Sequence, residues 1–163
     1  MTFFVWNDHL SVGNTFIDND HRHFIRLLNN LYNAMNMGRG PDVLGTVLND
    51  LIQYTREHFK REEDVMQDLN YAEFLEHKKE HEKLTRTVLE MQREFIAGET
   101  KLAVSLLKYL FDWLFEHIMN VDKKLGQAIQ HAESGKKYQI QDTHEQRKNS
   151  GLDHGLDSAG LSL

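Results

Sequence analysis

The residues best suited to chemistry in this sequence are histidines, because ten of the 163 residues are His and none is Cys. The lack of Cys excludes a disulfide scaffold, a thiolate iron–sulfur cluster, a c-type haem site and a thiol nucleophile. Imidazoles can instead combine with carboxylates to bind a transition metal. Six residues of these two types fall on apolar stripes with helical spacing: His21, His58, Glu62, His77, His81 and His117.

Four segments must position these side chains, and each repeats apolar residues at intervals of three and four, the spacing of an amphipathic helix. The segments run from Asp18 to Met37, Pro41 to Leu69, Tyr71 to Ala97 and Glu99 to Gln130. We expect Asp18 to be the N-cap of the first helix and the short connections to make neighbouring helices antiparallel. The predicted fold class is all-α, an up-down-up-down four-helix bundle.

Two segments flank the predicted bundle. Residues 1–17 are expected to form an N-terminal arm that packs on the bundle through its aromatic residues, which are Phe3, Phe4, Trp6 and Phe16. Residues 131–163 contain few large apolar side chains, so they are predicted to be a polar, mobile and disordered C-terminal tail outside a 1–130 domain. Because leucines recur in this tail, a short docking peptide is the alternative.

The six side chains should meet at one level of the bundle. In helices of alternating direction, the starts of the first and third lie beside the ends of the second and fourth. All six candidates lie at these places. A buried carboxylate without a partner costs several kcal/mol, and five inward imidazoles exceed what a hydrogen-bonded His–Glu network in a dry core can satisfy. A bound cation offsets this cost, so the pattern predicts a metal site.

A seventh candidate, Asp122, lies five residues after His117, which is about 140° around an ideal helix. The carboxylate reaches the site from the flank of the stripe, or a one-residue π-bulge brings it round. In a third alternative, Val121 faces inward and Asp122 lies on the surface. Periodicity alone leaves these alternatives open.

The number and type of candidate ligands favour two ions. Five imidazoles and one or two carboxylates exceed the four ligands of a structural zinc, whereas two octahedral ions can share them. Mixed imidazole and carboxylate ligation with open positions indicates iron, and the nitrogen-rich set favours reversible binding over oxidation chemistry. The competing motif His77-Lys-Lys-Glu80-His81 matches a zinc-protease pattern, but Glu80 lies off the apolar stripe and the other histidines stay unexplained.

The composition narrows the classes of partner. A formal net charge of −6 and a pI of about 5.9 disfavour nucleic-acid binding, which relies on a basic surface. No stretch approaches the ~18 apolar residues of a membrane span. Polar residues 7–9 interrupt the first apolar run, so we expect no secretory signal. These features predict a soluble, cytoplasmic protein.

Together, the seven candidates resemble the signature of the hemerythrin family, in particular its single-domain bacteriohemerythrins. The matching residues are His21, His58-x-x-x-Glu62, His77-x-x-x-His81 and His117-x-x-x-x-Asp122. The arm from Trp6 to Gly13, and the pair Ile17-Asp18 before the first candidate ligand, are also similar. The resemblance covers about residues 5–127.

The resemblance implies a di-iron centre, two Fe ions with an oxo or hydroxo bridge, that binds dioxygen reversibly for oxygen storage, transport or delivery. The implied ligands are His77, His81 and His117 on a six-coordinate iron, His21 and His58 on an iron with an open position for O2, and Glu62 and Asp122 as bridges.

The resemblance also implies an apolar O2 pocket, whose positions match Phe24, Phe59, Trp113, Leu114 and Ile118. On packing grounds alone, these five residues would be ordinary core. Two departures from the family stand beside the site. Asp20 replaces a frequent Gln and adds a charge beside His21, and Phe24 is bulkier than the usual aliphatic residue and would narrow the pocket.

Other functions can use the same site: a di-iron oxidase or peroxidase, a module that senses O2, nitric oxide or iron, and a structural metal bundle. An oxidase would need more carboxylate ligands or a base in the pocket, and a sensor is normally fused to an output domain. We therefore expect an O2-binding protein that is not an enzyme, with an O2-consuming protein as a partner. No role is expected for the remaining histidines, His9, His23, His131, His144 and His154.

Overall fold

The computed structural model describes residues 2–99 and 102–135. The chain divides into two compact units, residues 1–129 and residues 130–163. The helices of the first unit are α1 (Thr15–Asn36), α2 (Gly40–Asp68), α3 (Phe74–Ile96) and α4 (Leu102–His117), followed directly by a π-helix, η2 (Ile118–Asp122). Residues 123–129 are again α-helical, and the described residues contain no strand.

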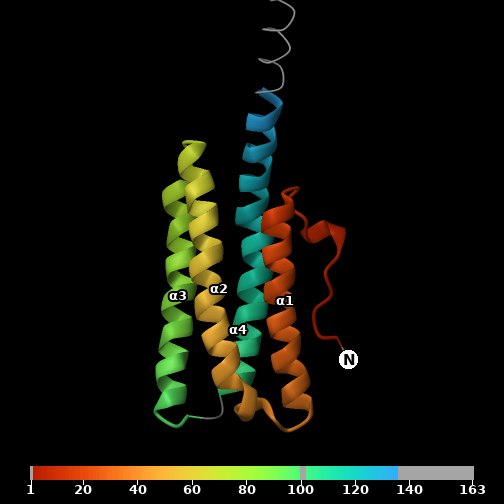
Figure 1. Ribbon diagram of the computed structural model, residues 1–163, viewed down its shortest axis with the longest axis vertical. Coiled ribbons are helices and arrows are strands. Elements are labelled where there is room, and N and C mark those ends of the chain that lie inside the picture. Colours follow the sequence, from red (N-terminus) through yellow and green to blue (C-terminus); the bar gives the residue numbers. More distant parts are fainter. Residues whose placement is uncertain (1, 100–101, 136–163) are drawn as a thin grey trace, which may run out of the picture. The chain divides into compact units, whose positions relative to one another are not determined.

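Neighbouring helices of the first unit run in opposite directions (Figure 1). Helix α1 packs against α2 and α4, and α3 packs against the same two helices, so the predicted up-down-up-down four-helix bundle is confirmed. One half of the bundle is filled by apolar side chains with 0–1% exposure, including Leu31, Leu48, Val88 and Leu106. Burial of each such side chain contributes about 1.5–3 kcal/mol, so this half stabilises the bundle by ordinary packing.

Helix α1 begins earlier than the sequence pattern predicts. Its N-cap is Asn14, whose side-chain oxygen accepts hydrogen bonds from the backbone N–H groups of Phe16 and Ile17. The prediction that Asp18 is the N-cap is therefore wrong. The buried carboxylate of Asp18 instead accepts hydrogen bonds from the Ser11 hydroxyl at 2.6 Å and from the Val12 N–H at 2.9 Å. Asp18 thus anchors the arm, because both donors belong to it.

The N-terminal arm, which includes a short 3₁₀ helix, η1 (Asp8–Leu10), packs on the bundle as predicted. The Asn29 side chain accepts hydrogen bonds from the N–H groups of Phe3 and Phe4 and donates one to the Phe4 carbonyl. The guanidinium of Arg22 lies 4.2 Å above the Trp6 ring. The prediction is wrong for Phe16, which belongs to α1 and is 80% exposed.

Residues 130–135, the described start of the second unit, are helical. The predicted disordered tail begins at residue 131, so the prediction of disorder is wrong for residues 131–135. The rest of the predicted tail, with its recurring leucines, falls on residues 136–163, which lie outside the described residues. Within the described part of the chain, no helix is both long and apolar enough to cross a lipid bilayer.

Candidate metal centre

The structure brings all seven candidate ligands into one buried cluster. Their relative exposures are only 0–4%: His21 on α1, His58 and Glu62 on α2, His77 and His81 on α3, His117 at the end of α4, and Asp122 at the end of η2. On α2 and on α3 the two candidates are four residues apart, which places both on one face of the helix. The predicted convergence at one level of the bundle is confirmed.

The π-helix settles how Asp122 reaches this cluster. In a π-helix the backbone repeats at i+5, so the five-residue step from His117 to Asp122 keeps both side chains on one face. Asp122 is completely buried, and its Oδ1 lies 3.1 Å from His117 Nε2. Of the three alternatives left open by periodicity, the bulge is correct. The alternative with Asp122 on the surface is wrong, because Val121 takes the half-buried flank instead.

Each of the two carboxylates presents its two oxygens to different histidines. On one side, His58 Nε2 lies 3.6 Å from Glu62 Oε1, and His21 Nε2 lies 3.0 Å from Asp122 Oδ2. His21, His58 and Glu62 have ligand atoms close enough to share one ion. This side offers two imidazole nitrogens and two carboxylate oxygens.

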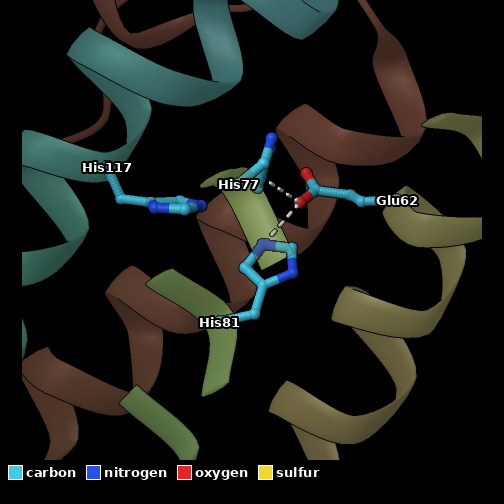
Figure 2. Close-up of side chains that lie close together, drawn as sticks. All are labelled: Glu62, His77, His81 and His117. Carbon is cyan, nitrogen blue, oxygen red and sulfur yellow. Dashed lines mark ion pairs between the residues drawn. The ribbon is translucent and has the colours of Figure 1, made fainter. Parts of the chain in front are cut away.

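The opposite oxygens face the other three imidazoles. Glu62 Oε2 lies 3.4 Å from His77 Nε2 and 3.1 Å from His81 Nε2. Asp122 Oδ1 lies 3.2 Å from His77 Nε2 and 3.1 Å from His117 Nε2. Figure 2 shows Glu62 directed at His77 and His81, with His117 entering from a different helix. This side offers three imidazole nitrogens and two carboxylate oxygens.

The spacing of these atoms suits cations between them. Two ligand atoms at about 2.1 Å from one ion and at a right angle are about 3.0 Å apart, close to the observed 3.0–3.6 Å separations. The nitrogen and oxygen atoms of six of the seven side chains are buried without a hydrogen bond of acceptable geometry. Each such atom costs about 1–3 kcal/mol. Cations within the cluster would satisfy the Nε2 atoms and the four carboxylate oxygens, which face one another, so the residues fit metal ions.

The charge states of the two carboxylates agree with a metal site. Burial raises the pKa of Glu62 and of Asp122, but the surrounding imidazoles outweigh it and hold both pKa values below their ordinary range. Burial lowers the pKa of His77, but its contacts with the two carboxylates raise it to about 9. Both carboxylates are therefore ionised at neutral pH, the form that binds metal.

Carboxylates outside the cluster also lie beside Nδ1 of two of the imidazoles. His58 Nδ1–H donates to Asp20 Oδ2 at 3.1 Å. The charge of Asp20, which the sequence places beside His21, therefore lies against His58. His81 Nδ1 lies 3.5 Å from Glu63 Oε1. Sequence pattern does not reveal the Glu63 contact, because Glu63 follows Glu62 on its helix and lies about 100° off the stripe.

The five predicted pocket residues, Phe24, Phe59, Trp113, Leu114 and Ile118, are all buried, with exposures of 0–9%. The Phe59 ring stacks on His81 at 3.8 Å, and the Trp113 ring stacks on His117 at 4.2 Å. Tyr54 is a further aromatic residue that the sequence pattern does not single out. Its ring lies 5.2 Å from His58, one helical turn away, and its buried hydroxyl has no hydrogen-bond partner among the described residues.

Two of the histidines without an expected role, His9 and His23, are exposed and belong to neither group of ligand atoms. His131 is also exposed, and His144 and His154 lie outside the described residues. Glu80, the carboxylate of the competing zinc-protease motif, is half-buried and belongs to neither group of ligand atoms. The structure instead joins His77 and His81 to Glu62.

Fold and site together define a four-helix-bundle protein with a buried histidine and carboxylate centre suited to metal ions. Residues 12–129 match the family described as Hemerythrin, the hemerythrin HHE cation binding domain. The chain belongs to the hemerythrin family.

Curated relatives and solved structures agree with this membership. The chain is 37% identical to a bacteriohemerythrin of Pseudomonas aeruginosa (strain LESB58) over 134 residues, 82% of this chain and 86% of the relative. It is 36% identical to the bacteriohemerythrin of Methylococcus capsulatus over 70% of this chain and 86% of the relative. A crystal structure of wild-type hemerythrin superposes with a TM-score of 0.71 at 33% identity, covering 77% of this chain and 97% of that chain.

Proposed function

We propose that this protein binds two iron ions in the buried cluster and uses them to bind O2 reversibly. The observation that carries the proposal is the division of Glu62 and Asp122, whose two oxygens face different groups of histidines. One metal ion would use only one side of each carboxylate, whereas two ions use both. The names of the bacteriohemerythrin relatives support the choice of iron and O2.

In this proposal the two irons have unequal ligand sets. His77, His81 and His117 with two carboxylate oxygens would supply five ligand atoms to one iron. His21 and His58 with the other two oxygens would supply four to the second iron, which would therefore keep an open position. An exogenous ligand would bind at this position.

The iron pair, when bound, supplies the electrons that O2 takes up and returns. The protein contributes charge and shape. The two ionised carboxylates offset the charge of the cations in a site that water does not reach, where electrostatic attraction is stronger than in bulk water. Phe24, Phe59 and Trp113 would form apolar walls around the open position, and exclusion of water and protons favours release of O2 over irreversible oxidation of the irons.

We propose binding rather than catalytic turnover, because the five residues proposed to line the pocket carry no group that could act as a base. Storage, transport or delivery of O2 in the cytoplasm, to a protein that consumes O2, is the physiological form of this proposal.

A visible spectrum and metal analysis of the aerobically purified protein test the proposal. The sample is then reduced without air, and air is readmitted. We expect two irons per chain and a coloured band that bleaches on reduction and returns with O2. Two irons that oxidise once without recovery of the band would contradict reversible binding and favour an oxidase or an iron sensor. Colourless zinc would contradict the di-iron centre itself.

A further inference from the structure

His58 differs from the other four candidate imidazoles in the atom that faces away from the cluster. Its Nδ1–H donates a hydrogen bond to Asp20 Oδ2 at 3.1 Å, across the contact between α2 and α1. The Nδ1 atoms of the other four imidazoles have no hydrogen-bond partner among the described residues: His21, His77, His81 and His117. His58 is therefore the one candidate ligand of the described chain whose ring is fixed by a hydrogen bond.

The carboxylate that fixes His58 is itself held by a cation. Arg61, one turn after His58 on α2, donates to Asp20 Oδ2 from Nη2 at 2.6 Å and from Nε at 3.1 Å. Asp20 is only 22% exposed, whereas Arg61 is half-exposed. Three groups thus form a chain from solvent to the cluster: the Arg61 guanidinium, the Asp20 carboxylate and the His58 imidazole.

The two outer residues should act on His58 in opposite directions. A carboxylate that accepts the Nδ1 proton fixes the tautomer with Nε2 free for metal, and it makes the imidazole a stronger electron donor. A guanidinium on the same carboxylate oxygen draws negative charge away and weakens this effect. The donor strength of His58 therefore depends on the balance between Asp20 and Arg61.

We infer that Asp20 and Arg61 are positioning residues that set the O2 affinity of the iron that His58 would hold. The inference rests on the proposed function. A stronger imidazole donor stabilises the oxidised iron that results from O2 uptake, so Asp20 raises the affinity and Arg61 limits it. The pair determines how far the centre favours the oxygenated over the deoxygenated form.

Two substitutions separate this role from a structural one. Asp20→Asn keeps an acceptor for the His58 Nδ1–H but removes the negative charge, and Arg61→Met keeps the charge but removes the cation. Lys60→Met is the matched control, because Lys60 neighbours Arg61 and forms an exposed ion pair with Asp64 that touches no candidate ligand. Substitution of a residue that hydrogen-bonds to a metal ligand typically lowers metal affinity or activity by about 10–100-fold.

We expect Asp20→Asn to lower the O2 affinity about tenfold and Arg61→Met to raise it by a similar factor, with Lys60→Met unchanged. Loss of a purely structural contact would move both variants in the same direction, so equal signs overturn the inference, as does no change in either variant. If Asp20→Asn does not retain iron, Arg61→Met decides: an affinity at or below that of Lys60→Met overturns the inference.

A second readout uses the iron-free protein and so does not depend on O2 binding. In ¹⁵N-labelled protein, we expect a slowly exchanging Nδ1–H on His58 in the wild type and in Asp20→Asn, and its loss in Asp20→Ala. A wild-type ring without this protected proton would overturn the positioning role. Wild-type protein that shows the protected proton but no reversible O2 band would instead contradict the proposed function.

Discussion

The iron-free protein should lose stability as the pH rises from neutral to alkaline, because of His77. This side chain is 1% exposed, and its Nε2 lies 3.2 Å from Asp122 and 3.4 Å from Glu62. Burial disfavours the imidazolium, but the two carboxylates outweigh it and raise the pKa of His77 from 6.5 to about 9. Removal of iron with a chelator therefore leaves a proton on His77 in its place.

The sign and size of the effect follow from this pKa. Between pH 6.5 and about 9 the folded chain keeps a proton on His77 that the unfolded chain has released. The stabilisation is complete below pH 6.5 and is lost as the pH rises through about 9. At 1.36 kcal/mol per pH unit for one proton, the loss amounts to about 3 kcal/mol. The ionised carboxylates do not reverse this trend, because their pKa values lie far below the window.

Urea denaturation of chelator-treated protein at several pH values between 6 and 10 measures this loss. The variant His77→Gln cannot take up the proton and should show a smaller pH dependence in this window. The remainder comes from His58, because burial lowers the pKa of His58 but Glu62 and Asp20 outweigh it and raise this pKa. The control His23→Gln removes an exposed histidine on α1 and should keep the wild-type dependence. A flat wild-type profile, or a slope in His77→Gln as steep as that of the wild type, would refute the reasoning.

Three further predictions concern single residues. His58→Ala should abolish O2 binding, measured as loss of the band that returns with air, because it removes one of two imidazoles on the open iron. Gly126→Ala should cost about 1–3 kcal/mol and expose the arm to proteases, since a Cβ there overlaps the Val12 carbonyl. Tyr54→Phe removes a buried hydroxyl without a partner and should leave thermal stability unchanged or raise it by about 1 kcal/mol. A lower melting temperature for Tyr54→Phe, or an uncleaved arm in Gly126→Ala, would contradict those two.

The fold and the site were predictable to the extent that one regular helical period describes the chain. Spacings of three and four placed His21, His58, Glu62 and their partners on the stripes that also carry the leucine core, and alternation of helix direction placed them at one level. Both inferences need only the rise and turn of an α-helix. They hold because the helices of the bundle run antiparallel to their neighbours.

The parts that the pattern left open are those where the period changes or where two helices meet. The π-helix that ends at Asp122 inserts one residue per turn, and nothing in the apolar pattern of Ile118–Asp122 marks the change. Two residues four positions apart, Asn14 and Asp18, both suit an N-cap. The choice between them depends on the backbone N–H of Val12 in the arm, whose position only the tertiary structure fixes.

The contacts behind the candidate ligands cannot be predicted from the helical pattern for the same reason. Asp20 and Arg61 lie on different helices and form an ion pair. Each directly precedes a candidate ligand, His21 and Glu62, without lying on its stripe. A position next to a ligand in sequence points about 100° away from the site, so its partner is a residue on the neighbouring helix. The sequence shows only that Asp20 adds a charge beside His21, its neighbour in the chain, whereas the hydrogen bond of Asp20 is to His58 on the other helix.

The bundle combines an apolar half that stabilises the fold with a polar half that works against it. Nitrogen and oxygen atoms of six candidate ligands are buried without hydrogen bonds, at about 1–3 kcal/mol each, a sum comparable to the whole stability of a small domain. The apolar burial of the leucine layers offsets that cost. Binding of metal would satisfy those buried atoms that face the cluster. Metal affinity and fold stability are therefore two measures of one free energy.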